Sequence, residues 1–330
     1  MSETTAISWT DATFNSWWGC TKVSPACDHC YAERDAKRFA AGRVLWGAGS
    51  ERRIFDVTTD AGAKHWKAPL NWAKTMPAKL GRRPRVFCAS MGDWLDLDAP
   101  IGEFVRLLDT IRLTPELDWL LLSKRIGNWQ KRLITASHHA CGEEQRELER
   151  WIDGWLEGRA PTNVWIGATV IDQAEADRDI PKLLGVPARV RFLSIEPMLG
   201  PITLDQRLVA PIKEGSQRGL RFIDWVIAGG ESGPHARPAH PDWFRSLRDQ
   251  CAEAGVPFHF KQWGEWAPMD CLPGGDLGGQ MRDGKAAIVH APGNPEGFFR
   301  RGDALVGRFG KKAAGRLLDG VEHNGFPEAA

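Results

Sequence analysis

Three cysteines lie within eleven residues near the start of the chain, Cys20, Cys27 and Cys30, at the spacing C-x6-C-x2-C. Thiols this close together are typical of metal ligands or redox partners, because packing alone does not require three of them. Zinc and iron–sulfur sites usually take four protein ligands, and this loop offers three, with His29 as a candidate fourth. A cluster held by three cysteines leaves one iron open for chemistry. The spacing predicts a three-thiolate site and leaves a zinc knuckle or a redox trio as alternatives.

The residues around these cysteines resemble the cluster loop of radical S-adenosylmethionine (SAM) enzymes, and most closely the branch that includes spore photoproduct lyase. The resemblance covers residues 15–34 and is carried by Asn15, Trp17, Gly19, Cys20, Cys27, Cys30, Tyr31 and Ala32. This loop departs from that pattern in a first gap of six residues instead of three, in Ser16 for a proline, and in His29 for an aromatic residue. Over residues 7–327 the chain also resembles an uncharacterised group of phage- and prophage-associated proteins with this longer loop.

The resemblance implies a [4Fe–4S] cluster on Cys20, Cys27 and Cys30, with SAM chelating the fourth iron. One electron from the reduced cluster would cleave SAM to methionine and a 5′-deoxyadenosyl radical, which would take a hydrogen atom from a substrate. The cofactor does the hard chemistry while the protein orients it. The implied partners are a flavodoxin- or ferredoxin-like reductant and, as a hypothesis, a nucleic-acid base or nucleotide as substrate, as in phage DNA modification.

Composition places the chain among ordinary globular proteins, with 330 residues, 42% hydrophobic and 26% charged residues, and a net charge of +1. No global field would draw it to nucleic acid or membrane, so any such contact is expected to be local. Seven cysteines without paired spacing outside the loop favour a reduced, cytoplasmic environment. The sequence has neither a signal-peptide pattern nor eighteen successive apolar residues, so no membrane partner is expected. Sixteen tryptophans could stack on bases or simply fill cores.

Apolar runs alternate with helical patterns along most of the chain. We expect strands at residues 7–10, 86–90, 119–123, 164–169, 190–194, 225–229 and 257–261. We expect helices at residues 30–41, 100–110, 128–134, 143–156, 173–184 and 241–254. This alternation predicts an α/β fold of parallel βα units, and it fits both a doubly wound sheet and a partial barrel.

The family resemblance favours a partial (β/α)6-type TIM barrel with insertions and a C-terminal extension. The barrel would span residues 1–266, with insertions at about 42–84 and 136–160, and the extension residues 267–330. The 42–84 segment is expected to be irregular, and its basic, tryptophan-bearing sequence, which includes Arg52 and Arg53, could contact phosphates and bases or remain a solvated linker. The basic residues near 311–316 are expected on a short tail helix.

Polar residues follow every expected strand, where functional side chains of such barrels lie. SAM offers an amino group, a carboxylate and ribose hydroxyls, which call for acidic, basic and hydroxyl partners. The strand ends supply candidates for SAM binding, namely Ser90, Asp93, Lys124, Thr169, Glu196, Gly229, Gly230 and Glu231. The two glycines would let backbone approach a ligand closely. The sequence does not decide whether Asp93 or Glu231 contacts the SAM amino group.

Cys88 lies near the end of an expected strand and is a candidate hydrogen-atom donor to a substrate radical, although a buried inert thiol is the ordinary role of such a cysteine. A different class of function is also open. A zinc- or cluster-bearing nucleic-acid-binding or redox-sensing protein would need a fourth protein ligand, for which His29 and Cys88 are the candidates, and would not bind SAM.

Overall fold

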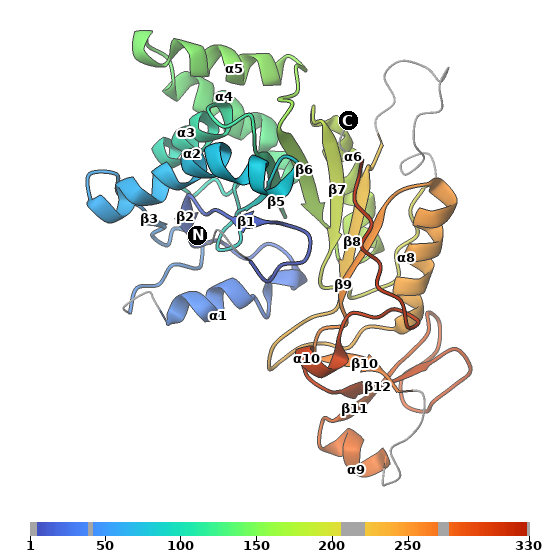
Figure 1. Ribbon diagram of the computed structural model, residues 1–330. Helices are drawn as coiled ribbons and strands as arrows, with labels where there is room; N and C mark the ends of the chain where they lie inside the picture. The colour runs from blue at the N-terminus through green and yellow to red at the C-terminus, as the bar shows by residue number, and fades with distance from the viewer. Residues whose placement is uncertain (1–4, 39–41, 206–221, 270–276, 329–330) are drawn as a thin grey trace. The chain divides into compact units, whose positions relative to one another are not determined.

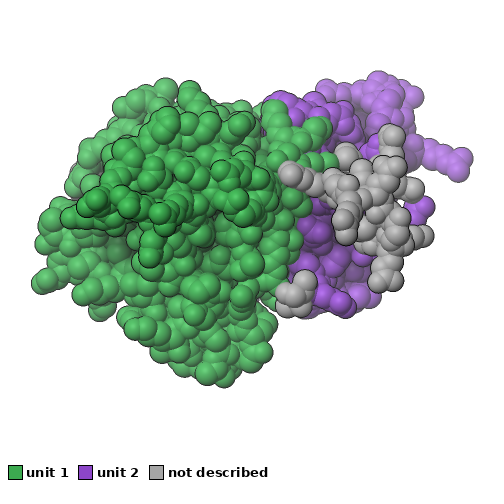
Figure 2. All heavy atoms as spheres, turned by 90° about the horizontal axis from the view of Figure 1, so that it is seen from above, with its two compact units in different colours: residues 1–168, 181–192 green, residues 169–180, 193–330 purple. Residues whose placement is uncertain are grey.

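The computed structural model of the protein describes residues 5–38, 42–205, 222–269 and 277–328 (Figure 1). By its internal contacts the chain forms two compact units, one of residues 1–168 and 181–192 and the other of residues 169–180 and 193–330 (Figure 2). Most of the connection expected at residues 200–221 lies outside the described residues, as does Cys271.

The main sheet has seven strands in the order β1-β4-β5-β6-β7-β8-β9. These are β1 (Ala12–Thr13), β4 (Arg85–Cys88), β5 (Asp118–Ser123), β6 (Val164–Thr169), β7 (Val190–Ile195), β8 (Trp225–Gly229) and β9 (Phe258–Gln262). The pairs β1–β4, β4–β5, β5–β6 and β8–β9 are parallel. The order follows the chain without the reversal that marks a doubly wound sheet. The fold is therefore mixed α/β and consistent with a partial α/β barrel.

Six of the seven expected strands coincide with β4 to β9 within a residue or two. The first one was wrong, because the strand that pairs with β4 is β1 and not the alternating run at residues 7–10. Ala12 and Thr13 pair with Val86 and Phe87, so this short edge strand is set by its neighbour rather than by its own sequence pattern.

Helices follow the strands at the expected places. They are α1 (Tyr31–Lys37), α3 (Ile101–Arg112), α4 (Trp129–His139), α5 (Arg146–Leu156), α6 (Gln173–Gly185) and α8 (Pro241–Ala254). The α3 helix shows why a helical pattern in the sequence becomes a helix here. Its apolar residues at helical spacing are fully buried, while its other side carries charges; the buried residues are Phe104, Leu107, Leu108 and Ile111. Short 3-10 turns, η1 (Pro25–Cys27), η2 (Ile126–Asn128) and η3 (Glu143–Gln145), precede α1, α4 and α5.

The segment 42–84 is not irregular, because it contains the 21-residue helix α2 (Asp60–Leu80). The Thr59 hydroxyl caps the start of α2 by accepting a hydrogen bond from the Gly62 N–H, and Gly81 ends it in the left-handed conformation. The helix buries one face that includes Trp66, Trp72 and Met76. A two-stranded ribbon, β2 (Trp17–Trp18) with β3 (Arg53–Ile54), precedes it in the first unit.

The second unit also holds a small antiparallel sheet of order β10-β12-β11, formed by β10 (Trp266–Pro268), β11 (Ala286–Val289) and β12 (Ala304–Arg308). Val306 is fully buried in this sheet's own core, which also contains Trp266 and Val289. Two short helices, α9 (Leu277–Arg282) and α10 (Lys311–Ala314), complete it. The tail helix is therefore a single turn.

Many tryptophans fill the cores of the two units. The fully buried ones are Trp9, Trp17, Trp94, Trp119, Trp155, Trp165 and Trp225. For these residues the ordinary packing role is the right one, and they are not exposed stacking platforms. Among the described helices, none combines the length and the apolar character that a membrane crossing needs.

Candidate metal and SAM site at the cysteine loop

The cysteine loop runs from the end of β1 to the start of α1, which is the order strand, loop and helix that the sequence predicts (Figure 1). The loop passes very close to its neighbours at Gly19, whose N–H donates to the Met91 carbonyl at 3.0 Å. Gly19 has φ of 114°, and a Cβ built there would lie 2.4 Å from the Leu45 carbonyl oxygen. Only glycine accommodates this conformation and this approach without strain.

Asn15 fastens the start of the loop to the end of β4. Its side-chain oxygen accepts from the Met91 N–H at 2.7 Å, and its amide nitrogen donates to the Ser90 hydroxyl at 3.0 Å. At the other end of the loop, the Tyr31 hydroxyl donates to the Ser90 carbonyl at 2.9 Å. Both ends of the cysteine loop are thus tied to residues 90–91, which the sequence places after the strand.

His65 of α2 holds the backbone of Asn15. Its Nε2 lies 2.8 Å from the Asn15 carbonyl oxygen, and its ring stacks on Phe55 with 3.7 Å between centroids. Burial lowers the pKa of His65 to about 4, and the hydrogen bond to Asn15 opposes this shift only in part. The imidazole is therefore neutral at pH 7, and its Nε2–H donates to the carbonyl.

Cys20 is held by backbone pairing on both sides. Its N–H donates to the Leu45 carbonyl at 3.2 Å, and its carbonyl accepts from the Gly47 N–H at 3.0 Å. Arg52 stabilises this pairing from a fully buried position, with its Nε 2.9 Å from Asp96 Oδ2 and its Nη2 2.9 Å from the Thr21 hydroxyl. Arg52 is therefore a structural residue of the loop, and its side chain is buried rather than exposed to solvent.

Asp93 and Arg125 form a buried ion pair at the ends of β4 and β5. Arg125 Nη1 lies 2.9 Å from Asp93 Oδ2, and the two side chains are 9% and 7% exposed. Asp93 also accepts from the Ser123 hydroxyl at 2.7 Å, from the Lys124 N–H at 3.0 Å and from the Leu95 N–H at 3.0 Å. Four donors thus saturate this carboxylate, and it organises the strand ends rather than presenting a free charge.

The Arg125 guanidinium reaches from this pair to the cysteine loop. Nη1 lies 3.3 Å from Cys20 Sγ, and Nη2 donates to the Thr21 carbonyl. Burial, together with the Asp93 charge, raises the pKa of Cys20 to about 12, although Arg125 pulls it down. The thiol keeps its proton at neutral pH unless a metal cation replaces it, which makes binding of a metal and loss of the proton a single linked event.

Cys27 and Cys30 lie in the second half of the loop. Cys27 closes η1, whose first residue is preceded by Ser24 as a cap, and Cys30 directly precedes α1. All three loop cysteines are free thiols, with Cys27 buried and the other two partly exposed. Within the described part of the chain, no three cysteine, histidine or carboxylate side chains already surround one metal-sized point.

This donor set fits an iron–sulfur cluster that takes three protein ligands. Three free thiols leave a fourth position open for a ligand from outside the chain, as the sequence predicts. Sites of this kind commonly take their final geometry only when the metal binds.

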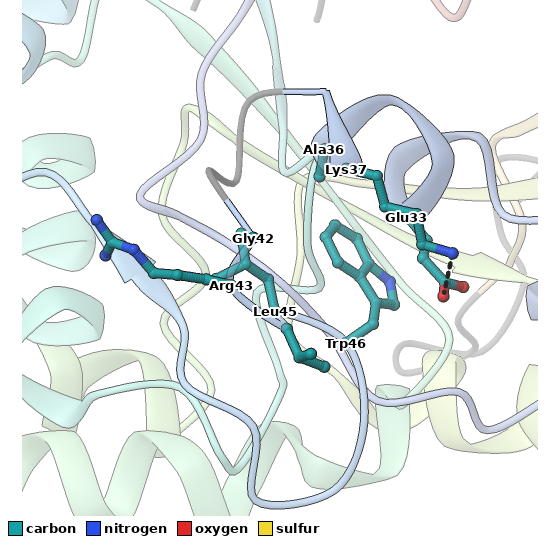
Figure 3. Close-up of a pocket in the computed structure, with 8 residues that line it drawn as sticks. Glu33, Ala36, Lys37, Gly42, Arg43, Leu45 and Trp46 are labelled. Carbon is teal, nitrogen blue, oxygen red and sulfur yellow. Dashed lines mark ion pairs between the residues drawn. The ribbon is translucent and has the colours of Figure 1, made fainter.

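A pocket of about 250 Å³ lies beside the loop, between α1 and the segment 42–46 (Figure 3). It is lined by Glu33, Ala36, Lys37, Gly42, Arg43, Val44, Leu45 and Trp46. Glu33 is neutralised by Lys22 at 3.0 Å and Lys37 at 3.5 Å. The pocket shares Leu45 with the backbone that holds Cys20, so it adjoins the cysteine loop.

Cys88 is the last residue of β4 and is fully buried. Burial raises the pKa of its thiol, and a contact with the Ser16 hydroxyl opposes this only in part. The environment favours a neutral S–H, which is the form that donates a hydrogen atom and equally the form of an inert core cysteine.

The remaining candidates, Thr169, Glu196, Gly229, Gly230 and Glu231, belong to the second unit. Thr169 is the last residue of β6 and is buried. Glu231 is also buried and takes three hydrogen bonds from Arg237, through the backbone N–H at 2.7 Å, Nε at 2.8 Å and Nη2 at 2.6 Å. The Glu231 carboxylate is therefore paired with Arg237, just as the Asp93 carboxylate is paired with Arg125.

Glu196 is less engaged than the other two acids. Lys261 Nζ lies 3.2 Å from its Oε1 and 3.3 Å from its Oε2. Gly229 makes room for this side chain, because a Cβ there would lie 2.5 Å from Glu196 Oε1, and a Cβ on Gly230 would lie 1.9 Å from the Trp263 carbonyl oxygen. The two glycines thus allow close approach of the protein's own atoms.

Residues 4–327 match the protein family described as "Protein of unknown function (DUF5131)". The chain belongs to this family. No curated protein matches it, and neither does any solved structure.

In this DUF5131 protein, Asp93 accepts a hydrogen bond from the Lys124 N–H, and Ser90 accepts one from Asn15 of the cysteine loop. The strand-end reasoning selected Ser90, Asp93 and Lys124 as candidates. That reasoning did not predict that Thr21, Arg52, His65 and Asp96 support the cysteine loop. No local pattern marks them, since each acts through a contact with a distant part of the chain. Arg125 directly follows the candidate Lys124 in the chain, and its contacts with Cys20 and Asp93 are what the structure adds.

Proposed function

We propose that this protein is a radical SAM enzyme in which Cys20, Cys27 and Cys30 hold a [4Fe–4S] cluster and SAM is the co-substrate. The observation that carries the proposal is the position of the three free thiols, which lie between β2 and α1 on one loop that is anchored to the polar ends of β4 and β5. When bound and reduced, the cluster supplies the electron that breaks the sulfur–carbon bond of SAM, giving methionine and a carbon radical that takes hydrogen from the substrate.

The chain's own residues hold and orient the reacting parts. Asn15 and Tyr31 fix the ends of the cysteine loop on residues 90–91, and Gly19 lets the loop run between its neighbours. Asp93 positions Arg125 against Cys20. The burial of this pair excludes water from one side of the loop, which strengthens its electrostatic interactions.

The candidates that we propose for SAM binding are the strand-end residues Ser90, Asp93, Lys124, Thr169, Glu196, Gly229, Gly230 and Glu231. Of these, Asp93 accepts four hydrogen bonds within the protein and Glu231 accepts three, so we assign these two acids to positioning neighbouring residues rather than to direct contact with SAM. Glu196 retains the most capacity for an outside ammonium group. Cys88, a buried S–H at the end of β4, is proposed as a hydrogen donor to a substrate radical.

The finer fold assignment is part of the same proposal. The monotonic strand order and the helices between strands support a (β/α)6-type TIM barrel, with the cluster at its carboxyl-end mouth. The substrate we propose is a nucleic-acid base or nucleotide, and the reductant a flavodoxin- or ferredoxin-like protein.

The test is an anaerobic reconstitution with iron and sulfide, followed by reduction with dithionite and addition of SAM. We expect 5′-deoxyadenosine and methionine by mass spectrometry from the wild type and none from Cys27→Ala. Cys141→Ala is the matched control, because Cys141 is an exposed cysteine outside the loop and its loss should change neither iron content nor product.

A reconstituted cluster without deoxyadenosine would refute the proposal. So would a stoichiometric zinc ion bound by four protein ligands, which would favour a nucleic-acid-binding or redox-sensing protein instead. Loss of product in Cys141→Ala as large as that in Cys27→Ala would show that the loop cysteines have no special role.

A further inference from the structure

One side chain joins the cysteine loop to the strand ends, and it does so at a sulfur atom. Arg125 Nη1 lies 3.3 Å from Cys20 Sγ, which is within hydrogen-bond range for sulfur, while Nη2 donates to the carbonyl of the next residue, Thr21. A guanidinium presents its N–H groups in a rigid planar fork, so the two contacts fix its plane relative to the loop. The sulfur therefore faces a donor of fixed direction.

The guanidinium is held in that place by buried groups. Asp93 Oδ2 accepts from the same Nη1 at 2.9 Å, and the remaining acceptor positions of Asp93 are filled by Ser123, Lys124 and Leu95. The Arg125 N–H also donates to the Ser123 hydroxyl at 2.8 Å. Arg125 cannot leave the sulfur without leaving a buried carboxylate, so the contact is built into the fold.

Cys20 differs in this respect from the other two loop cysteines. Within the described part of the chain, neither Cys27 nor Cys30 has a charged hydrogen-bond donor to its thiol that matches Arg125. Hydrogen bonds to ligand sulfurs and the net charge around a cluster both set its reduction potential. A cation beside one ligand favours the reduced cluster, which carries one more negative charge.

We propose that Arg125 is a positioning residue that donates a hydrogen bond to the Cys20 ligand and thereby raises the reduction potential of the cluster, with Asp93 holding the guanidinium in place. This inference rests on the proposed function, because it needs a cluster on Cys20. It goes further by naming the residue that adjusts how readily the site accepts its electron. Arg125 does not touch the substrate in this role.

The experiment compares reconstituted wild type with Arg125→Lys by a potentiometric titration followed by electron paramagnetic resonance. Lysine keeps the positive charge beside Asp93 but lacks the planar fork, in which Nη1 contacts the carboxylate and the sulfur while Nη2 contacts the Thr21 carbonyl. At the wild-type midpoint, we expect the ratio of reduced to oxidised cluster to fall roughly tenfold, which corresponds to about 59 mV for one electron. Iron and sulfide content should be unchanged.

Arg132→Lys is the matched control. Arg132 is also a buried arginine of the first unit, but its Nη2 donates to the Ala99 carbonyl and its guanidinium lies over Phe104, away from the loop cysteines. Its midpoint potential should equal that of the wild type. Equal midpoints for Arg125→Lys and wild type, or an equal shift in Arg132→Lys, would overturn the inference.

A second measurement needs no variant and covers the case in which Arg125→Lys does not fold. Wild-type protein with 15N-labelled arginine should show a 15N hyperfine coupling to the reduced cluster in pulsed resonance spectra, and its absence would overturn the inference. A wild type that assembles no cluster would overturn both proposals. A shifted potential without deoxyadenosine would sustain the inference and refute the SAM chemistry alone.

Discussion

Replacing Asp93 by asparagine should strongly destabilise the first unit. The substitution keeps the shape of the side chain but removes its charge and turns one acceptor oxygen into a donor. Asp93 Oδ2 receives the Lys124 N–H and Arg125 Nη1, and Oδ1 receives the Ser123 hydroxyl and the Leu95 N–H. Whichever way the asparagine turns, two donors face its new NH2 group.

The magnitude follows from burial. Both members of the pair are more than nine-tenths buried, so the substitution leaves the Arg125 charge without its carboxylate in a poorly solvated place. Removing one partner of a buried ion pair costs about 3–5 kcal/mol. That is a large part of the total stability of an ordinary domain, about 5–15 kcal/mol. Asp93→Asn should therefore unfold at a markedly lower urea concentration than the wild type.

The assay is urea denaturation of the metal-free protein at pH 7, followed by circular dichroism, with the free energy of unfolding extrapolated to water. Asp98→Asn is the matched control. The Asp98 side chain is 42% exposed and lies 3.4 Å from Arg52, whose closer partner is Asp96. A solvated pair of this kind contributes at most about 1 kcal/mol. A loss below about 1 kcal/mol in Asp93→Asn, or equal losses in both variants, would refute the reasoning.

Three further outcomes are expected. Since burial lowers the pKa of His65 to about 4, the unfolded chain takes up its proton first as the pH falls below 6.5. The wild type should lose on the order of 3 kcal/mol of stability between pH 6.5 and 4 that His65→Gln does not lose, measured by urea denaturation across this range. Gly19→Ala should destabilise the protein by at least about 1–3 kcal/mol and impair iron uptake, because its Cβ would lie 2.4 Å from the Leu45 carbonyl oxygen. The control Gly102→Ala should be neutral or stabilising, because a Cβ there has no neighbour within 4 Å. Glu196→Gln should weaken SAM binding to the reconstituted protein about tenfold or more in equilibrium dialysis, and unchanged binding would remove Glu196 from the site.

The sequence predicts the regular elements well where their apolar pattern is decided locally. The run at residues 119–121 and the helical spacing of α3 bury the side chains that their apolar patterns select. The helix α2 was missed because Pro69 and Pro77 are ordinary helix breakers. Burial of one face, with Trp72 and Met76, outweighs the hydrogen bonds that the two prolines remove. Tertiary packing therefore stabilises α2, and the local sequence pattern does not indicate this packing.

The same distinction holds for the candidate site. Residues 20, 93 and 125 follow three different strands, and the carboxyl ends of parallel strands meet at one edge, so their proximity is predictable. Which residue pairs with which is not predictable, because it depends on side-chain directions that the strand pattern leaves open. The sequence therefore offered Asp93 as a contact for SAM, whereas the structure pairs its carboxylate with Arg125.

Counting donors around the three strand-end acids narrows the choice that the sequence left open. Asp93 has four donors, and Glu231 has three from Arg237 alone. Among the described residues, the donor that contacts the Glu196 carboxylate is the Lys261 ammonium group, at 3.2–3.3 Å. An outside ammonium group gains most from a carboxylate whose remaining lone pairs are unused. If SAM binds through its amino group to one of these acids, the charge balance selects Glu196, which the sequence marks only as one of several polar residues after a strand.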